Sequence, residues 1–259
     1  LGGSSAFGDH LAANPETWTE LQRALPTPTE MLYTLLSTVG AEPATFAEDP
    51  ERPDTASADL TTPGTYRAAE GDHKAQLKNV YRTLMMRIAA HDLAGTFYSR
   101  KGQSRPQSRV GFREVTSLTT ALADAALTAA LAGAVRVVYG DEPLDAQLSV
   151  MAMGKCGAGE LNYISDVDVI FVGSEATPKV TRLASEFNRI GSACFFEVDA
   201  NLRPEGKSGA LVRTLDSHVA YYKRWAETWE FQAQLKARPQ TGYLPLGQDY
   251  LDAIGPMVW

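Results

Sequence analysis

The amino-acid sequence predicts an α+β protein, in which a small sheet is flanked by helices and joined to further helical regions. In the first half of the chain, apolar residues recur every three to four positions, which is the period of an amphipathic helix. Beyond residue 146, short segments alternate apolar and polar residues, as half-buried strands do. The 259 residues are enough for one large domain or two small ones.

Residues 1–110 are predicted to form a mainly helical N-terminal region. Helical spacing of apolar residues covers 5–39, as several short helices, and returns over 73–97. Residues 40–72 are rich in Pro, Ala, Thr and Asp without clear periodicity, so we expect a long surface loop there. The basic segment 99–109 is expected to be a solvated loop rather than a binding arm.

Residues 111–259 are predicted to form a second domain that contains the sheet, ends in helices and is expected to be truncated. Its longest helical signal covers 115–139, where spaced leucines and valines alternate with alanines, which are strong helix formers. A glycine-containing turn is predicted over 154–165. The strands are predicted over 147–153, 166–172 and 195–202, and the helices over 178–194, 217–237 and 246–254.

The composition argues against several classes of protein. The net charge of -7 disfavours nonspecific nucleic-acid binding, although it leaves room for a local phosphate site. The two cysteines, Cys156 and Cys194, form no C-x-x-C pair, so neither a zinc site nor a redox motif is indicated. We recognise no signal peptide and no apolar run long enough to span a bilayer. We therefore expect a cytoplasmic protein without membrane partners and, since the sequence does not begin with Met, a piece of a larger polypeptide.

The first candidate for chemistry is the pair Asp166 and Asp168 in the strand DVDVIFV. Residues two apart in a strand point to the same face, so the two carboxylates project together and repel each other. A cation such as Mg²⁺, which prefers carboxylate and phosphate oxygens, would relieve the repulsion. Taken alone, the pattern fits a solvated pair of acids equally well. An EF-hand is excluded, because no Gly or Glu follows at the required spacing.

The second candidate is the turn that begins with Gly154 and Lys155. A glycine after a strand lets backbone N–H groups approach a phosphate, and the side chains of Lys155 and Ser165 can add donors. The turn is not a P-loop, because Ser149 stands where the first Gly is needed and Cys156 where Ser or Thr is needed.

A third acid, Asp199, lies in the next predicted strand and is followed by Arg203. If this strand lies beside the second one, three carboxylates converge and can hold two metal ions for an in-line displacement at phosphorus. Arg203 could then donate to a phosphate as a fork, although a structural salt bridge is its alternative role. These three acids are the expected metal-binding and catalytic residues.

Other chemically distinctive residues are given structural roles first. Trp225, Trp229 and Phe231 can share helical faces, which favours core packing over stacking on a nucleotide. Cys156 is expected to be a small packing residue rather than a reactive thiol. The cations that could form a phosphate-binding rim, or equally a solvated helix face, are Lys223, Arg224, Lys236 and Arg238.

Three blocks of sequence together carry a resemblance to a known family. The runs MAMGKCGAGELNYISDVDVIFV, FFEVDANLRPEGKSGALVRT and YYKRWAETWEFQAQLKARP follow in order between residues 148 and 239. They closely resemble the bifunctional glutamine synthetase adenylyltransferase/adenylyl-removing enzymes, which belong to the polymerase-β-like nucleotidyltransferase superfamily. The resemblance implies a small mixed sheet with flanking helices and a nucleotidyltransferase catalytic domain over 111–259.

The resemblance also implies an activity, which serves the regulation of nitrogen assimilation. One half of such an enzyme attaches AMP from ATP to a tyrosine of glutamine synthetase, and the other removes it by Mg²⁺-dependent phosphorolysis, yielding ADP. The metal would be held by Asp166, Asp168 and Asp199. The expected nucleotide- and phosphate-binding residues are Gly154, Lys155, Ser165 and Arg203.

The choice between the two halves follows from the amino acids in the three sequence blocks. The stretches 159–168 and 228–233 are similar to the N-terminal, adenylyl-removing half, in the style of high-GC Gram-positive members. Deadenylylation is therefore the leading expectation, and adenylyl transfer from ATP is the alternative. A third possibility is a non-catalytic module that binds glutamine synthetase or a PII-type signal protein, against which the presence of all three acids argues.

Overall fold

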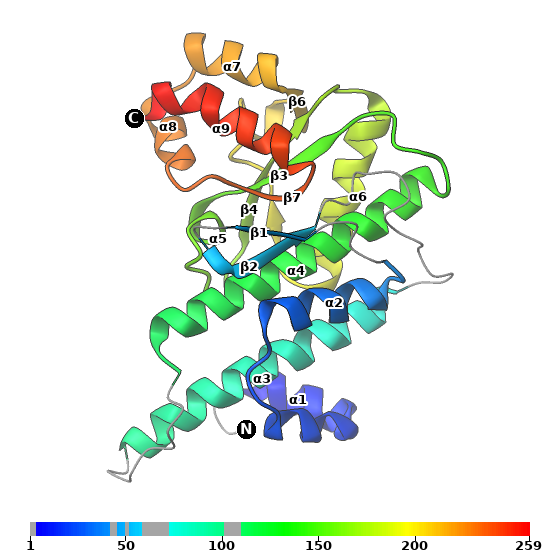
Figure 1. The fold of residues 1–259 in the computed structure, drawn as a ribbon, viewed down its shortest axis with the longest axis vertical. Coiled ribbons are helices and arrows are strands. Elements are labelled where there is room, and N and C mark those ends of the chain that lie inside the picture. Colours follow the sequence, from blue (N-terminus) through cyan, green and yellow to red (C-terminus); the bar gives the residue numbers. More distant parts are fainter. Residues whose placement is uncertain (1–3, 42–45, 50–51, 59–72, 101–109) are drawn as a thin grey trace.

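The computed structural model describes residues 4–41, 46–49, 52–58, 73–100 and 110–259. The N-terminal helices gather at one end of the molecule and the C-terminal helices at the other, with the larger sheet between (Figure 1). The helix α4 (Phe112–Tyr139) runs between the N-terminal helices and this sheet and packs against both. This arrangement agrees with the α+β class predicted from the sequence.

The helices predicted for the N-terminal region are present. Ser4 caps the first of them by accepting a hydrogen bond from Phe7 N–H, and Thr27 caps α2 in the same way through Glu30 N–H. Proline occupies a first-turn position in η1 and α2, where its missing N–H costs nothing. The bounds are α1 Ser5–Ala13, the 3-10 helix η1 Pro15–Gln22, α2 Pro28–Thr38 and α3 Lys74–Arg100.

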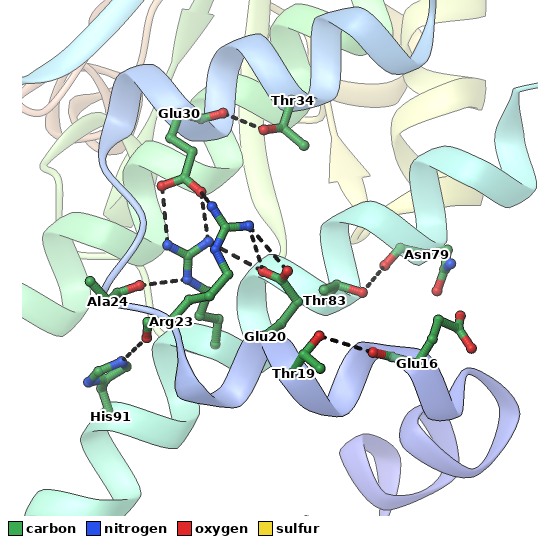
Figure 2. A network of polar contacts seen from close by, with 11 residues as sticks. Glu16, Thr19, Glu20, Arg23, Ala24, Glu30, Thr34, Asn79, Thr83 and His91 are labelled. Atoms are coloured by element: carbon green, nitrogen blue, oxygen red, sulfur yellow. Dashed lines mark hydrogen bonds and ion pairs between the residues drawn. The ribbon is translucent and has the colours of Figure 1, made fainter.

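A cluster of arginines and glutamates fastens η1, α2 and α3 together (Figure 2). Arg87 on α3 is buried, and its guanidinium donates to both carboxylate oxygens of Glu30, at 2.7 and 3.2 Å. It also donates to the carbonyl oxygen of Ala24 at 2.6 Å. Arg23 lies on the solvent side and bridges Glu20 and Glu30. We refer to Arg23, Arg87, Glu20 and Glu30 as the Arg87 cluster.

The long loop expected over residues 40–72 is partly wrong. Strands β1 (Phe46–Asp49) and β2 (Arg52–Ala58) form an antiparallel hairpin with an irregular register beside Asp49. The hairpin is built by pairing between its two strands and by packing of β2 against α4, neither of which produces a local apolar period. The rest of this segment, and residues 101–109 of the basic run, lie outside the described residues.

Helix α4 explains a second difference from the sequence analysis. By length and composition it could cross a membrane, contrary to the expectation that no run of the chain could. However, 78% of its apolar window is buried inside the protein, against α2, α6 and the sheet. Burial in the core therefore accounts for its composition. The helix ends at Gly140, whose φ of 61° suits a residue without a side chain.

The larger sheet is mixed and has five strands, in the order β5-β4-β3-β7 with β6 also pairing with β4. Strand β4 is antiparallel to β3 but parallel to β5 and β6, so it forms the centre of the sheet. Strand β7 lies at the edge and is antiparallel to β3. The bounds are β3 Leu148–Ala152, β4 Val167–Gly173, β5 Val198–Asp199, β6 Val212–Thr214 and β7 Arg238–Gly242.

Two hydrophobic cores cover the two faces of this sheet. Val167, Val169 and Phe171 of β4 belong to the core shared with α4 and α6. Ile170 and Val172, which alternate with them, belong to a second core built with α7 and α9. The helix bounds are α6 Pro178–Cys194, α7 Leu215–Arg224, α8 Thr228–Gln234 and α9 Leu244–Val258.

Several strands differ from the prediction. The third predicted strand, over 195–202, shrinks to the two residues of β5. Strands β6 and β7 were not predicted, and residues 238–242 of β7 contain a proline, which removes a backbone donor and normally argues against a strand. An edge position tolerates this proline, and an edge position cannot be recognised from local sequence.

Candidate active site

The acids singled out in the sequence lie at the beginning of the central strand. Asp166 directly precedes β4, and Asp168 is its second residue. Asp168 lies in register with Asp199 on the neighbouring parallel strand β5. Val167 and Val198 turn into the core under α4 and α6, so Asp168 and Asp199 project from the opposite face of the sheet. The side-by-side placement on which the convergence of these acids depended is therefore present.

The glycine turn lies directly against Asp168. Gly154 follows β3 with a φ of 53°, and a Cβ added to it would come within 2.8 Å of Asp168 Oδ2. The N–H of Met153 donates to the carbonyl oxygen of Asp168 at 2.9 Å, which fixes the turn beside the acid. Any side chain at position 154 would displace this carboxylate, so a glycine is required both by conformation and by space.

The electrostatics of the site leave negative charge only partly compensated. Burial raises the pKa of Asp168 above its ordinary value, and the neighbouring charges of Asp166 and Asp199 raise it further. The ammonium group of Lys155, which is exposed on the turn, acts in the opposite direction. A bound cation would relieve this repulsion, because it favours the charged form of all three acids.

The donor set suits Mg²⁺, although the described residues contain no group of three or more His, Cys, Asp or Glu side chains already gathered as a metal site. Mg²⁺ is commonly bound by one or two carboxylates, with water and substrate phosphates as its other ligands, so a complete protein cage is not needed. Ser165 Oγ lies nearby in sequence, enclosed and without a hydrogen-bond partner. A substrate oxygen would satisfy it.

Arg203 shapes the loop that follows Asp199. Its guanidinium donates to the carbonyl oxygens of Ala200 at 2.7 Å, Lys207 at 3.1 Å and Gly209 at 3.1 Å. Three of its five N–H groups are used in this way. The alternative structural role foreseen for Arg203 thus takes the form of a clamp on backbone carbonyls rather than a salt bridge.

The sequence analysis missed a buried ion pair behind the turn. Arg238 donates to both carboxylate oxygens of Asp124 on α4, and to the carbonyl oxygen of Cys156. Arg238 is therefore not part of an exposed phosphate rim, and Lys236 pairs with Glu160. The one available signal was an acid in the middle of an alanine-rich apolar helix, because such an acid needs a buried partner.

The tryptophans expected in the core lie at the surface instead. Trp225 is 65% exposed and Trp229 is 53% exposed, whereas Phe231 packs against Tyr222 as expected. Helices α7 and α8 are short and separated by a break, so the common helical face assumed for these three residues does not exist. Cys156 is buried, and burial raises the pKa of its thiol, which confirms it as an unreactive packing residue.

Comparison with known proteins identifies relatives over the whole chain. A sequence model of the family described as glutamate-ammonia ligase adenylyltransferase matches residues 30–252. Proteins named bifunctional glutamine synthetase adenylyltransferase/adenylyl-removing enzyme are 63% identical in Corynebacterium efficiens, 58% in Corynebacterium diphtheriae and 52% in Nocardia farcinica. Each match covers 100% of this chain but only 25%, 26% and 24% of the respective relative. The chain thus spans about a quarter of the length of these curated relatives.

Proposed function

Since the chain belongs to the glutamate-ammonia ligase adenylyltransferase family, we propose that it carries the site that removes AMP from an adenylylated tyrosine of glutamine synthetase. Inorganic phosphate is the second substrate in this proposal, and ADP is released. The observation that carries the proposal is the placement of Asp168, in register with Asp199 and against the Gly154 turn. The resemblance of residues 159–168 and 228–233 to the adenylyl-removing half favours removal over transfer.

The proposal includes a polymerase-β-like catalytic fold. A small mixed sheet with helices on both faces supports it, as does the position of the acids at the beginning of the central strand. In this proposal Asp166, Asp168 and Asp199 hold Mg²⁺. When bound, the metal would supply positive charge that offsets the charge of the reacting phosphates and of the leaving oxygen.

The residues around the acids would position the substrates. Lys155 and the Ser165 hydroxyl would donate to phosphate oxygens, with Gly154 leaving room for close approach. An oxygen of inorganic phosphate then forms a bond to the phosphorus of AMP, while the bond from that phosphorus to the tyrosyl oxygen breaks. The tyrosyl oxygen takes up a proton, and the products are ADP and unmodified tyrosine. Arg203 would keep the loop after Asp199 in place and orient remaining N–H groups toward phosphate.

Adenylyl transfer from ATP to the tyrosine is the second candidate. The relatives' names contain both activities, and the same acids and phosphate-binding groups would serve either reaction. Incubation with labelled ATP, Mg²⁺ and unmodified glutamine synthetase separates the two, because only transfer labels the protein.

The decisive experiment replaces Asp168 by Asn in the full-length protein. We expect Asp168→Asn to lower the rate of ADP formation from adenylylated glutamine synthetase and phosphate by more than about a hundredfold, because an electrostatic group is removed from the site. Full activity of this variant would show that Asp168 does not belong to the active site. The matched control is Asp252→Asn on α9, an exposed acid paired with Gln248, which should leave the rate unchanged.

The stability of the same variant shows whether a loss of activity reflects unfolding. The pKa of Asp168 is raised in the folded protein, so ionised Asp168 opposes folding at neutral pH, and this cost shrinks as the pH falls below the raised pKa and is gone below the ordinary pKa. Asn carries no charge at any pH. The melting temperature of Asp168→Asn without metal should therefore equal or exceed that of the unmodified protein at neutral pH.

A further inference from the structure

The ion pair between Asp124 and Arg238 is enclosed between α4, β7 and the glycine turn. Arg238 Nη2 lies 3.0 and 2.9 Å from the two carboxylate oxygens of Asp124. The Asp124 side chain is 4% exposed and that of Arg238 is 13% exposed. The partners are far apart in the chain, so the pair joins the middle of α4 to the first residue of β7.

The ion pair and Thr120 on α4 hold the turn over residues 154–161 at several points. The carbonyl oxygen of Cys156 accepts from Arg238 at 3.2 Å, and Cys156 Sγ lies 3.8 Å from Asp124 Oδ1. At the far end of the turn, Leu161 N–H donates to the hydroxyl of Thr120, one helical turn before Asp124 on α4. Both halves of the turn are therefore attached to groups on α4.

Backbone packing makes the attachment rigid. A Cβ added to Gly157 would lie 2.0 Å from the carbonyl oxygen of Lys236 and 2.7 Å from that of Ala152. The turn thus lies directly on the segment that leads into β7, with no room for a side chain between them. The turn therefore lies next to Arg238 through its backbone as well as through the hydrogen bond to Cys156.

The free energy of such a pair argues for a role beyond stability. Removing two charges from water costs several kcal/mol per ion, and the attraction between the two ions only roughly offsets this cost. A pair of apolar residues at the same positions therefore often stabilises the fold as well as an ion pair, or better. What apolar residues cannot supply is a direction for the Cys156 carbonyl and for the backbone on either side of it. This backbone carries Gly154, which contacts Asp168, and Lys155.

We propose that the Asp124–Arg238 ion pair is a positioning device, which fixes the turn over residues 154–161 for phosphate binding. The proposal rests on the phosphate-binding function proposed above for Gly154 and Lys155. Neither Asp124 nor Arg238 touches the substrate in this scheme. Loss of the pair should weaken phosphate binding through the turn, while the chain still folds.

The test is a double variant, Asp124→Leu with Arg238→Met, made in the full-length protein. Since both charges are removed together, the melting temperature should stay close to that of the unmodified protein. Amide hydrogen exchange over residues 154–161 should become faster, and the KM for phosphate should rise by about 10- to 100-fold, as is usual when a supporting group is removed. A purely structural pair predicts normal exchange and normal KM once stability is restored, and that result would overturn the proposal.

A matched control comes from the Arg87 cluster, far from the sheet. The double variant Glu30→Leu with Arg87→Met also removes a buried arginine and its carboxylate, but it should leave KM and the exchange of residues 154–161 unchanged. If the Asp124 and Arg238 double variant does not fold, Arg238→Lys replaces it. Arg238 makes its contacts with Asp124 and Cys156 through Nη2, and the lysine side chain is one bond shorter, so its ammonium group keeps the charge but does not reach that position. Faster exchange of the turn in this variant supports the proposal, and exchange like that of the unmodified protein overturns it.

The two proposals fail in different ways. If the unmodified protein neither removes nor transfers AMP, the proposed function fails, and hydrogen exchange alone decides whether the pair positions the turn. If the unmodified protein is active and the double variant keeps its KM and its exchange rates, only the positioning role fails.

Discussion

Two arginine–carboxylate clusters lie in different parts of this molecule, one among the N-terminal helices and one between α4 and β7, and they differ in their access to water. In the Arg87 cluster, whose contacts Figure 2 shows, one arginine is buried. The side chain of the other, Arg23, is 55% exposed. The cluster borders an open pocket of about 330 Å³ between η1, α2 and α3. Beside the candidate active site, Asp124 and Arg238 are almost completely enclosed.

The difference teaches which cluster can tolerate the loss of a partner. When Arg87 is removed, water from the adjoining pocket can solvate Glu20 and Glu30, which are already partly exposed. When Arg238 is removed, the Asp124 carboxylate stays enclosed and cannot be solvated in the same way. We therefore expect the loss of stability caused by equivalent substitutions to depend on how well water reaches the remaining partner, rather than on the number of hydrogen bonds removed.

The largest expected effect is that of Arg238→Met. It leaves the Asp124 carboxylate buried and without its cation, so the free energy of unfolding should fall by about 3–5 kcal/mol. Chemical denaturation measures this loss. The Asp124→Leu substitution in the same chain should recover most of it, and a loss below about 1 kcal/mol would mean that water reaches Asp124 after all.

An intermediate effect is expected for Arg87→Met, at about 1–3 kcal/mol, because the Ala24 carbonyl and Glu30 lose donors but gain water. The hydrogen bond from Arg87 lowers the pKa of Glu30, so this pair contributes stability above the ordinary pKa of the glutamate and loses it as the pH falls through the lowered value. Denaturation at neutral and acidic pH should show a smaller acid-induced loss in the variant than in the unmodified protein. If the loss of stability on acidification is the same in the variant and in the unmodified protein, groups other than Glu30 cause it.

The smallest effect is expected for Arg23→Ala. Its guanidinium bridges Glu20 and Glu30 from the solvent side, where water screens ion pairs, so its loss should cost less stability than the loss of Arg87. The loss should shrink further in high salt, because salt screens exposed charges. If Arg23→Ala lowers the free energy of unfolding as much as Arg87→Met does, exposure does not determine how much these ion pairs stabilise the protein.

The same contrast explains how much of the molecule could be predicted from the sequence. Strict alternation in DVDVIFV predicted the central strand, which begins at Val167, because strand geometry is local. The place of Asp199 depended on which strand lies beside β4, and this is decided by the pairing of β5. The pair of Asp124 and Arg238 joins residues 114 positions apart, and no local pattern encodes such a partner.

Edge strands and surface aromatics were missed for related reasons. Strand β7 contains a proline and β6 is very short, so neither shows the alternation of apolar and polar residues that predicts a strand. Pairing with neighbouring strands forms both of them. Trp225 and Trp229 follow a helical spacing that a break between α7 and α8 interrupts. In each case a tertiary contact or a chain break overrides the period that the sequence displays.

The exposure of the tryptophans has a spectroscopic consequence. The chain has four of them, and Trp18, Trp225, Trp229 and Trp259 all lie on the surface. Their indole rings already meet water in the folded state, so unfolding changes their surroundings little and intrinsic fluorescence should follow denaturation poorly. Quenching by a soluble quencher should instead report whatever comes to cover α7 and α8, which makes the indoles of Trp225 and Trp229 built-in optical probes of contact at that surface.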